Sequence, residues 1–462
     1  MVVQLIEAKP AENPTLLWLR TGPSVKALPD SLAGYACHAM AMDDFRGAVE
    51  DGSANPPVSA ILLDLQSPFP SPLRLLAAIH VRLSPGGKLY LRHWGSHEDP
   101  CLMESQSGEE ATRYLARLAS HAGYSLPYEQ AGLLTLDKAE LPRWQTQSVS
   151  ETDVSECREL FHRVFKGEIS PAFWEWKYGG GRGHSILARR DNGSLAAHYG
   201  ATCRDLLFLG RETRALQIGD VMVDPPERGV FTRRGVFFQV ARTFQECHFG
   251  FERKFQLAYG FPNARAMRVA ERLGLYAEAD RLTELRWVAD STGSGGLFAP
   301  VVERLSPSSK VDALVDGLWR NMSKAMAPFI VVKRDAAYFH YRYLAHPEHN
   351  YDCFLVKKRI TRAPLGVFVL ARGDGHVRLM DVICGPTDIQ QIIGCARKEI
   401  AGQGFPELVG WVASSQLEYF LGPECEQRST DILIPEHAWT PGVPLEKVRG
   451  RWWVSMGDTD FL

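Results

Sequence analysis

Short apolar runs alternate with segments of helical spacing over the first 145 residues. This alternation predicts strands that are each followed by a helix, which is the pattern of a parallel sheet flanked by helices. The predicted strands lie at residues 16–19, 60–65, 88–92 and 132–136, and the predicted helices at 73–83 and 109–122. A polar segment with Pro142 follows at residues 137–150 and predicts a linker.

The chain from residue 150 to 290 has a different order of elements. It opens with two helices, the second of which has Ser170 and Pro171 at its start. Serine is a favoured N-cap, and proline suits the first turn of a helix. The predicted elements are helices at 154–165 and 171–178, strands at 184–189, 195–202 and 206–209, and a strand–loop–helix–strand–helix stretch between Gln217 and Tyr276.

A loop inside that stretch, residues 228–235, carries the most specific chemistry. It follows a strand that breaks at Asp224-Pro225-Pro226 and leads into a helix at residues 236–247. The N–H groups of a helix N-terminus are unpaired and positive, and glycine lets an anion approach the backbone closely. The alternative interpretation is an ordinary exposed loop with solvated arginines. The candidate anion-binding residues are Arg228, Gly229, Arg233, Arg234, Gly235 and Val236.

The stretch from Gln217 to Tyr276 resembles the core of the GNAT (Gcn5-related) N-acyltransferase family. Residues 220–225 are similar to the family's strand that ends in V-x-P. Asn263, Ala266, Gly274 and Leu275 fall on its N-x-x-A segment with the family's spacing. The resemblance implies an α+β fold, an acetyl-CoA or longer acyl-CoA donor whose pyrophosphate lies at the loop, and no metal.

The resemblance also implies roles for single residues. Asp220 takes the place of the acidic residue that acts as base, and its alternative interpretation is a polar strand residue satisfied by the backbone. Asn263 would position the pantetheine arm. The strand residues that would hold the thioester are Val221, Met222 and Val223, and the candidates for the acceptor pocket are Phe261, Pro262 and Trp176.

Two departures from the family pattern affect the expected chemistry. The loop is longer than the family's usual one and lacks its second small residue. Ala270 occupies the place of the tyrosine that protonates the departing thiolate, and alanine has no proton to donate. Either Tyr259 or Tyr276 supplies the proton, or the thiolate leaves unassisted, or the chain is not a working acetyltransferase.

The last third of the chain echoes the middle third. Residues 338–343 resemble 173–178, an aromatic segment that we expect to pack against a sheet, with a substrate pocket as the alternative interpretation. Residues 381–386 resemble 220–225. Self-similarity at a fixed offset predicts a duplication, here a second GNAT-like lobe over residues 300–462. Thr387-Asp388 replaces the basic loop, so we expect a degenerate lobe with a structural or substrate-binding role.

The first 145 residues resemble the later half of a Rossmann-type methyltransferase. The resemblance lies in a strand, a helix and the turn Leu83-Ser84-Pro85-Gly86-Gly87-Lys88-Leu89. The place of the nucleotide-binding turn holds a single glycine, Gly22. We therefore expect a degenerate domain over residues 1–145 that no longer binds S-adenosylmethionine. The predicted fold class is α/β, with this Rossmann-like domain before a GNAT domain at 150–290 and the second lobe.

Composition narrows the possible functions. The chain has 462 residues, 45% of them hydrophobic and 23% charged, which predicts several ordinary globular domains. Its net charge of −2 offers no global field for nucleic acid. No apolar run approaches the ~18 residues that span a bilayer, and the nine cysteines include no C-x-x-C pair. We expect a cytoplasmic protein without membrane or nucleic-acid partners, and no oligomeric state is predicted.

The favoured hypothesis is an acyl-CoA-dependent N-acyltransferase that modifies the amine of a small molecule. The first alternative is a non-catalytic acyl-CoA-binding or assembly protein on the same scaffold, which Ala270 motivates. The second is an aminoacyl-tRNA-dependent transferase, which the net charge weakens.

Overall fold

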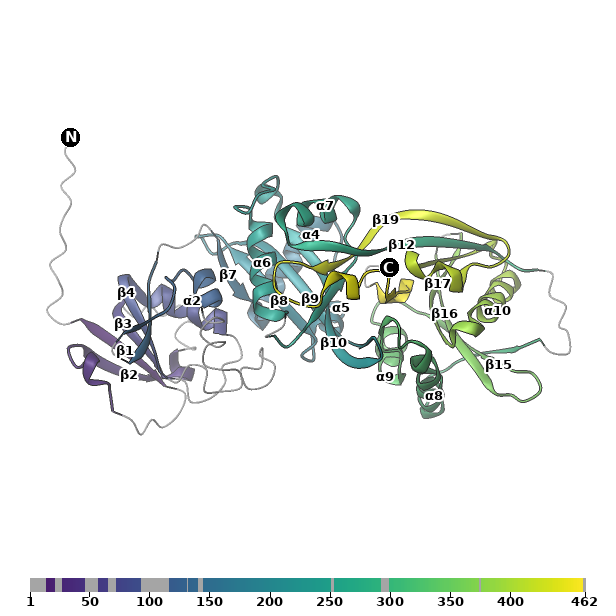
Figure 1. Cartoon of the computed structure of the whole chain (residues 1–462), viewed down its shortest axis with the longest axis horizontal. Helices are drawn as coiled ribbons and strands as arrows, with labels where there is room; N and C mark the ends of the chain where they lie inside the picture. The colour runs from purple at the N-terminus through teal and green to yellow at the C-terminus, as the bar shows by residue number, and fades with distance from the viewer. Residues whose placement is uncertain are drawn as a thin grey trace.

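Three β-sheets follow one another along an elongated molecule (Figure 1). The structure is a computed structural model that describes residues 14–20, 27–45, 57–64, 72–92, 116–130, 132–139, 144–250, 253–291, 299–373 and 375–459. We call the three the N-terminal, central and C-terminal sheets. Gly22 and residues 292–298 lie outside the described residues.

The N-terminal sheet confirms the predicted strands but is mixed. Its first four strands pair in parallel, whereas β6 pairs antiparallel with both β4 and β5. The prediction of a parallel sheet was therefore wrong at this edge, because only two residues separate β5 from β6 and so short a connection can join only antiparallel strands. Its order is β2 (Ala36–Ala41), β1 (Thr15–Arg20), β3 (Val58–Asp64), β4 (Leu83–Arg92), β6 (Leu133–Asp137) and β5 (Tyr128–Gln130), with helix α2 (Pro72–Arg82) between β3 and β4.

Part of the predicted linker is a strand. β7 (Gln145–Ser148) belongs to the central sheet, where it pairs antiparallel with β8 (Gly183–Arg189). Trp144, directly before it, is buried in a core that also includes residues of the N-terminal sheet. The polar composition of this segment concealed its role, because a strand paired along one side can keep polar residues on its exposed face.

A buried polar contact joins the first two sheets. Glu246 accepts hydrogen bonds from the His121 ring at 2.5 Å and from the Trp439 indole at 2.8 Å. Burial raises the pKa of Glu246, but these partners outweigh that effect and leave it lowered. Burial lowers the pKa of His121 more than Glu246 raises it, so the ring donates as a neutral group.

Replacing Glu246 with alanine should lower the free energy of unfolding by about 2 kcal/mol, because two buried donors lose their acceptor. The measurement is chemical denaturation followed by tryptophan fluorescence. Glu129→Ala, at an exposed position of β5, is the control and should change little. An unchanged midpoint for Glu246→Ala would show that the contact contributes no net stability.

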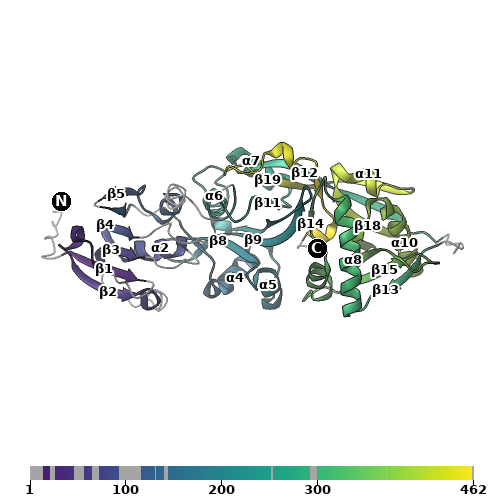
Figure 2. The ribbon, with the colours of Figure 1, turned by 60° about the horizontal axis from the view of Figure 1, so that its bottom comes forward.

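The central sheet carries helices on both faces (Figure 2). Residues of α4 and α5 pack with Leu187, Leu195 and Met222 on one face. Residues of α6 and α7 pack with Tyr199 and Leu216 on the other. The helices are α4 (Val154–Phe165), α5 (Pro171–Tyr178), α6 (Val236–His248) and α7 (Ala264–Leu273), close to their predicted bounds.

Long strands replace several short ones in this sheet. The two strands predicted on either side of Cys203 are one continuous strand, β9, which pairs with β8 along its first half and with β14 along its end. Two strands from the last third of the chain, β14 and β20, extend the sheet beyond β9. The strands are β8 (Gly183–Arg189), β9 (Leu195–Phe208), β10 (Arg211–Val223), β11 (Leu257–Gly260), β14 (Ile330–Val332) and β20 (Trp452–Trp453).

The C-terminal sheet has a similar element order. Two antiparallel strands, β16 and β17, are followed by a helix and a strand parallel to β17, as β9 and β10 are followed by α6 and β11. Its strands are β13 (Val301–Arg304), β15 (Asp352–Lys357), β16 (Pro364–Arg372), β17 (Val377–Cys384), β18 (Glu407–Ala413), β12 (Tyr276–Val288) and β19 (Cys425–His437). Its helices are α8 (Ser309–Ala325), α9 (Ala336–Phe339) with a π-helical turn at His340–Leu344, α10 (Ile389–Gly402) and α11 (Leu417–Phe420).

An antiparallel ribbon of β12 and β19 joins the central and C-terminal sheets (Figure 1). The second half of β12 pairs with β18 of the C-terminal sheet. The far half of β19 lies beside β11 of the central sheet, where the Leu433 N–H donates to the Pro262 carbonyl at 3.0 Å. The central and C-terminal sheets therefore each contain strands from the middle third and from the last third of the chain.

In the part of the chain that the structure describes, no helix has the length and hydropathy needed to cross a membrane. The cysteines of those ranges are free thiols.

Candidate functional site

The central sheet opens where β10 and β11 separate. β10 pairs with β11 from Ala215 to Ile218, while its pairing with β9 continues to Val223. A β-bulge interrupts the β9 ladder between Gly219 and Met222. Asp220, at the bulge, has a left-handed φ of +48°. Such a φ is uncommon for a residue other than glycine and indicates a backbone that surrounding contacts hold in place.

The Asp220 side chain is held by helix α5. The Tyr178 hydroxyl donates to Asp220 Oδ2 at 2.5 Å, and Lys177 Nζ lies 2.8 Å from the same oxygen. The side chains of Lys177 and Asp220 are only 4% and 10% exposed. A lysine ammonium this deeply buried needs a carboxylate partner, and Asp220 is in the position of that partner.

A buried histidine holds the backbone of the bulge. His198 Nδ1 lies 2.7 Å from the carbonyl oxygen of Asp220. Burial lowers the pKa of His198, more than the neighbouring Asp220 raises it, so the neutral ring donates through Nδ1. Gly200 makes room for this arrangement, since a Cβ there would lie 2.5 Å from His198 Cε1 and 2.6 Å from the Tyr178 hydroxyl oxygen.

Sequence reasoning missed Lys177, Tyr178 and His198 as parts of this site. The first two belong to the aromatic segment of α5, for which we favoured a packing role. Lysine and tyrosine next to one another are ordinary on a helix surface, so only their burial marks them as special. One signal was available, because Tyr178 has its counterpart in Tyr343 of the echoed segment.

The predicted anion loop precedes α6 as expected. Gly235 is the N-cap of α6, and no side chain caps this helix. The loop closes tightly, since a Cβ on Gly235 would lie 2.3 Å from the Val230 carbonyl oxygen. Residues 228–234 are exposed, with Phe231 57% exposed. The first-turn N–H groups of α6 therefore face an open loop, which is the geometry of an anion site.

The three loop arginines differ in their contacts. Arg228 donates to the Val223 carbonyl at 3.0 Å and so braces the end of β10. Arg233 donates to the Leu273 carbonyl at 3.4 Å, and its guanidinium lies 5.1 Å from the Trp439 ring centre. These two side chains shape the loop. Arg234 is exposed, so its charge is available at the surface.

The second predicted segment lies at the start of α7. Asn263 is the N-cap of this helix, and its side-chain oxygen accepts the Ala266 N–H at 2.9 Å. Ala270 is fully buried in the core under α6. Phe261 packs edge-on against Tyr259, and the Pro262 carbonyl binds β19.

The two tyrosines predicted as proton donors lie in cores. Tyr259 is 1% exposed, packs against Trp452 and donates to Gln217 at 3.4 Å. Tyr276 pairs with Tyr199 in the core under α6, on the face of the sheet opposite to α5. Tyr178 is the tyrosine that the structure places on Asp220.

Trp176 lies between α5 and the π-helical turn. Its ring stacks on Tyr341 at 4.6 Å and on Phe173 at 5.3 Å, and its indole donates to the Tyr341 carbonyl at 2.9 Å. Trp176 is 8% exposed. Its contacts are those of a residue that joins the two parts of the chain.

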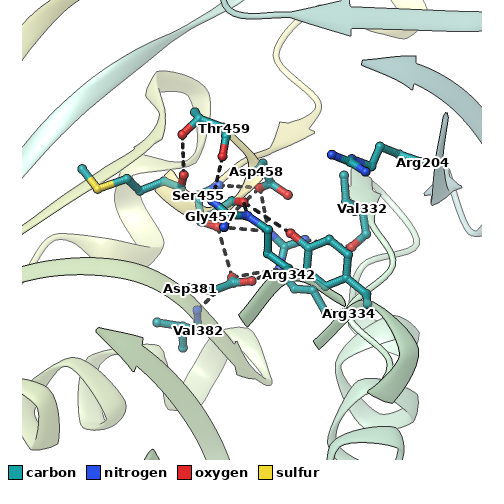
Figure 3. Close-up of polar contacts among 12 residues, drawn as sticks. Arg204, Val332, Arg334, Arg342, Asp381, Val382, Ser455, Gly457, Asp458 and Thr459 are labelled. Atoms are coloured by element: carbon teal, nitrogen blue, oxygen red, sulfur yellow. Dashed lines mark hydrogen bonds and ion pairs between the residues drawn. The ribbon is translucent and has the colours of Figure 1, made fainter. Parts of the chain in front are cut away.

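A second tyrosine–carboxylate pair, Tyr343 and Asp381, lies in the C-terminal part of the chain. Figure 3 shows its Asp381 carboxylate beside Arg334, Ser455 and Asp458. The Tyr343 hydroxyl donates to Asp381 on β17 at 2.8 Å, and Arg334 and Ser455 donate to the same carboxylate at 2.9 and 3.1 Å. Arg334 also pairs with Asp458 at 2.7 Å. All five side chains are buried, so the last described residues cover this pair completely.

Comparison with known proteins found a family match in the central part of the chain. Residues 145–278 match the acetyltransferase (GNAT) domain, and this match suggests acyltransferase activity. No curated protein matches the chain.

Several solved structures are similar at low identity. A probable N-acyltransferase from Enterococcus faecalis is 14% identical, with a TM-score of 0.49 over 63% of this chain and 71% of its own. A GCN5-related N-acetyltransferase from Anabaena variabilis is 12% identical, with a TM-score of 0.48 over 64% and 73%. The N-myristoyltransferase of Saccharomyces cerevisiae, with bound myristoyl-CoA, is 10% identical, with a TM-score of 0.42 over 70% and 87%.

The described residues contain no cluster of three or more histidine, cysteine, aspartate or glutamate side chains placed to hold a metal ion.

Proposed function

We propose that this protein is an acyl-CoA-dependent N-acyltransferase that modifies the amine of a small molecule. The observation that carries the proposal is the opening between β10 and β11, which has the bulge at Asp220 on one side and the uncapped N-terminus of α6 at its end. Both features lie inside the GNAT match at residues 145–278.

The residues present suit an acyl-CoA donor. The diphosphate would meet the first-turn N–H groups of α6 beside Gly235, with Arg234 close by. The pantetheine arm would run along Val221–Val223, whose edge beyond Ile218 does not pair with β11. The thioester carbonyl would then lie near the bulge, where a strand N–H is available to its oxygen.

The reaction is attack of an amine nitrogen on the thioester carbon. A C–N bond forms, the C–S bond breaks, and its electron pair leaves on sulfur. The amine must lose its extra proton before attack, and the thiolate must gain one. Asp220 and its partners lie at the bulge and would take the extra proton of the amine.

We infer that the C-terminal sheet and its helices form a second, degenerate GNAT-like lobe. The shared order of strands and helices supports this, as does the repeat of the Tyr–Asp pair on equivalent strands. Asp388 precedes α10 where the basic loop precedes α6, and it would repel a diphosphate. The N-terminal sheet is proposed as a Rossmann-like docking unit.

Charge reversal at Arg234 tests the donor site. Arg234→Glu should weaken acetyl-CoA binding about tenfold or more, because a charge-assisted contact to phosphate becomes repulsive. The measurement is titration calorimetry at low salt, with thiol release from acetyl-CoA followed in the presence of an amine panel. Arg211→Glu, exposed at the turn between β9 and β10, is the matched control and should bind normally.

Three outcomes separate the hypotheses. Acetyl-CoA binding with thiol release supports an acyltransferase. Binding without release by any acyl-CoA would support the non-catalytic alternative. Absence of binding by the intact protein would overturn the proposal, and binding of tRNA in its place would favour the aminoacyl-tRNA alternative.

A further inference from the structure

We propose that Tyr178 takes the proton of the incoming amine and passes its own proton to Asp220, with Lys177 holding the carboxylate in place. This inference rests on the proposed acyltransferase function. It assigns the deprotonation of the amine to helix α5, whereas the sequence analysis predicted Asp220 as the base and gave Tyr259 or Tyr276 a separate role, protonation of the thiolate.

The direction of the hydrogen bond supports a relay. The Tyr178 hydroxyl donates its hydrogen to Asp220 Oδ2 at 2.5 Å. A hydroxyl that donates one hydrogen bond still has lone pairs with which to accept another. Asp220 Oδ2 is already occupied by the Tyr178 hydroxyl and by Lys177, so an amine would meet the tyrosine oxygen rather than this carboxylate oxygen.

The tyrosine ring is held in one orientation. It packs against Trp174 with ring centres 4.6 Å apart and against His198 edge-on at 6.1 Å. Gly200 lies beneath its hydroxyl, and His198 in turn holds the Asp220 carbonyl. The ring and the bulged backbone are thus fixed to each other, and such preorganisation is what a proton-transfer group needs.

Lys177 acts on the relay through Asp220. Its ammonium lies 2.8 Å from Asp220 Oδ2, the oxygen that also accepts from Tyr178. An ammonium at this distance fixes the position of the carboxylate beside the tyrosine hydroxyl. Lys177 is a positioning residue, because it acts through the carboxylate.

The Tyr343–Asp381 pair is an internal comparison. Here too a tyrosine hydroxyl donates a hydrogen bond to an aspartate, at 2.8 Å, but Tyr343 is 3% exposed and Asp381 is 1% exposed. Ser455 and Arg334 occupy the remaining positions around the carboxylate (Figure 3). No acceptor can reach this copy. The chain thus buries the Tyr343–Asp381 pair completely and leaves the Tyr178–Asp220 pair partly exposed.

The proposed step balances. An ammonium proton moves to the Tyr178 oxygen while the tyrosine proton moves to Asp220, which leaves a neutral amine. The amine forms the C–N bond, the C–S bond breaks, and the electron pair stays on sulfur. The thiolate takes a proton from the nitrogen of the collapsing intermediate. Asp220 returns its proton through Tyr178 to water.

Tyr178→Phe and Tyr343→Phe make a matched pair of test variants. With acetyl-CoA and an alkylamine panel at pH 7, Tyr178→Phe should lower kcat/KM about 100-fold, as loss of a positioned acid–base group does. The loss should shrink as pH rises, because free amine then needs no base. Acetyl-CoA affinity should not change. Tyr343→Phe should keep kcat/KM and only lower stability.

Hydroxylamine gives a readout that a structural role would not move. It is mostly unprotonated at pH 7, so its transfer should survive in Tyr178→Phe. An equal loss with hydroxylamine and alkylamines would overturn the relay, and so would full activity of Tyr178→Phe. Acetyl transfer to hydroxylamine but to no alkylamine would also contradict the relay, because the relay is proposed to deprotonate acceptors that arrive as ammonium ions.

Two further measurements keep the test decisive. Calorimetry with acetyl-CoA is done first, because absence of binding by the wild type would refute the acyltransferase proposal itself. Should Tyr178→Phe fail to fold, solvent deuterium isotope effects on the wild type replace it. A normal isotope effect with alkylamines and none with hydroxylamine supports the relay, and equal effects overturn it.

Discussion

Replacing Arg334 with methionine should destabilise the protein by about 3–5 kcal/mol, the usual cost of removing one partner from a buried ion network. Arg334 is fully buried and pairs with Asp381 at 2.9 Å and Asp458 at 2.7 Å (Figure 3). Without it, two buried carboxylates face each other with no cation between them. A loss of this size is a large part of the 5–15 kcal/mol that stabilises a typical domain, roughly a third.

The pH dependence of that variant has a definite sign. Burial already raises the pKa of Asp458, against the opposing effect of Arg334, and Asp381 raises it further. Removal of Arg334 leaves the two raising effects. A folded-state pKa above the unfolded value means that the folded protein binds the proton more tightly, so stability rises as pH falls through the folded pKa. Part of the loss should return between neutral pH and the ordinary aspartate range near ~4.

Chemical denaturation from pH 7 down to 5 measures both effects. Arg320→Met, at an exposed position of α8, is the control and should be nearly neutral at every pH. A small, pH-independent loss for Arg334→Met would show that water reaches the two carboxylates and that the last described residues do not seal the network.

Replacing Gly235 with alanine should reduce acetyl-CoA affinity at least 100-fold, or by about 2.7 kcal/mol. A Cβ at this position would lie 2.3 Å from the Val230 carbonyl oxygen, which is backbone and cannot rotate away. The loop at residues 228–234 must then move from the start of α6. The φ of Gly235 is −80°, so the effect is steric and owes nothing to backbone strain.

Gly317→Ala is the matched control for that substitution. Gly317 lies within α8, and a Cβ there meets nothing within 4 Å. Alanine should stabilise this helix by up to about 1 kcal/mol and leave binding unchanged. Calorimetry with acetyl-CoA checks both variants. Normal affinity for Gly235→Ala would place the diphosphate away from the α6 N-terminus.

Local features of the site followed from residue types. The helix start at Ser170 was visible as a cap residue and makes its expected cap in the structure. Asn263, which we had expected to position the pantetheine arm, is the N-cap of α7. The loop before α6 was visible because glycine, proline and arginine interrupt an otherwise apolar stretch. These signals depend on neighbours within one turn, which the order of residues specifies directly.

Burial of charge could not be predicted in the same way. Lys177 pairs with Asp220 43 positions along the chain, and Arg334 pairs with Asp458 124 positions away. A charged residue is ordinarily exposed, so the sequence offers no reason to expect these to be inside. These charged side chains can be buried only because the folded chain supplies a partner of opposite charge. Which residue becomes the partner depends on which strands come together.

The sequence by itself determined most of the helices and strands, because apolar spacing and cap residues act over a few positions. It also indicated the GNAT resemblance and the anion loop. The tertiary structure alone decided that β12 and β19 join two sheets, that β14 and β20 extend the central sheet, and that Tyr178 meets Asp220. Strand pairing is a long-range choice, set by whichever faces and edges bury the most apolar surface and satisfy the most polar groups together.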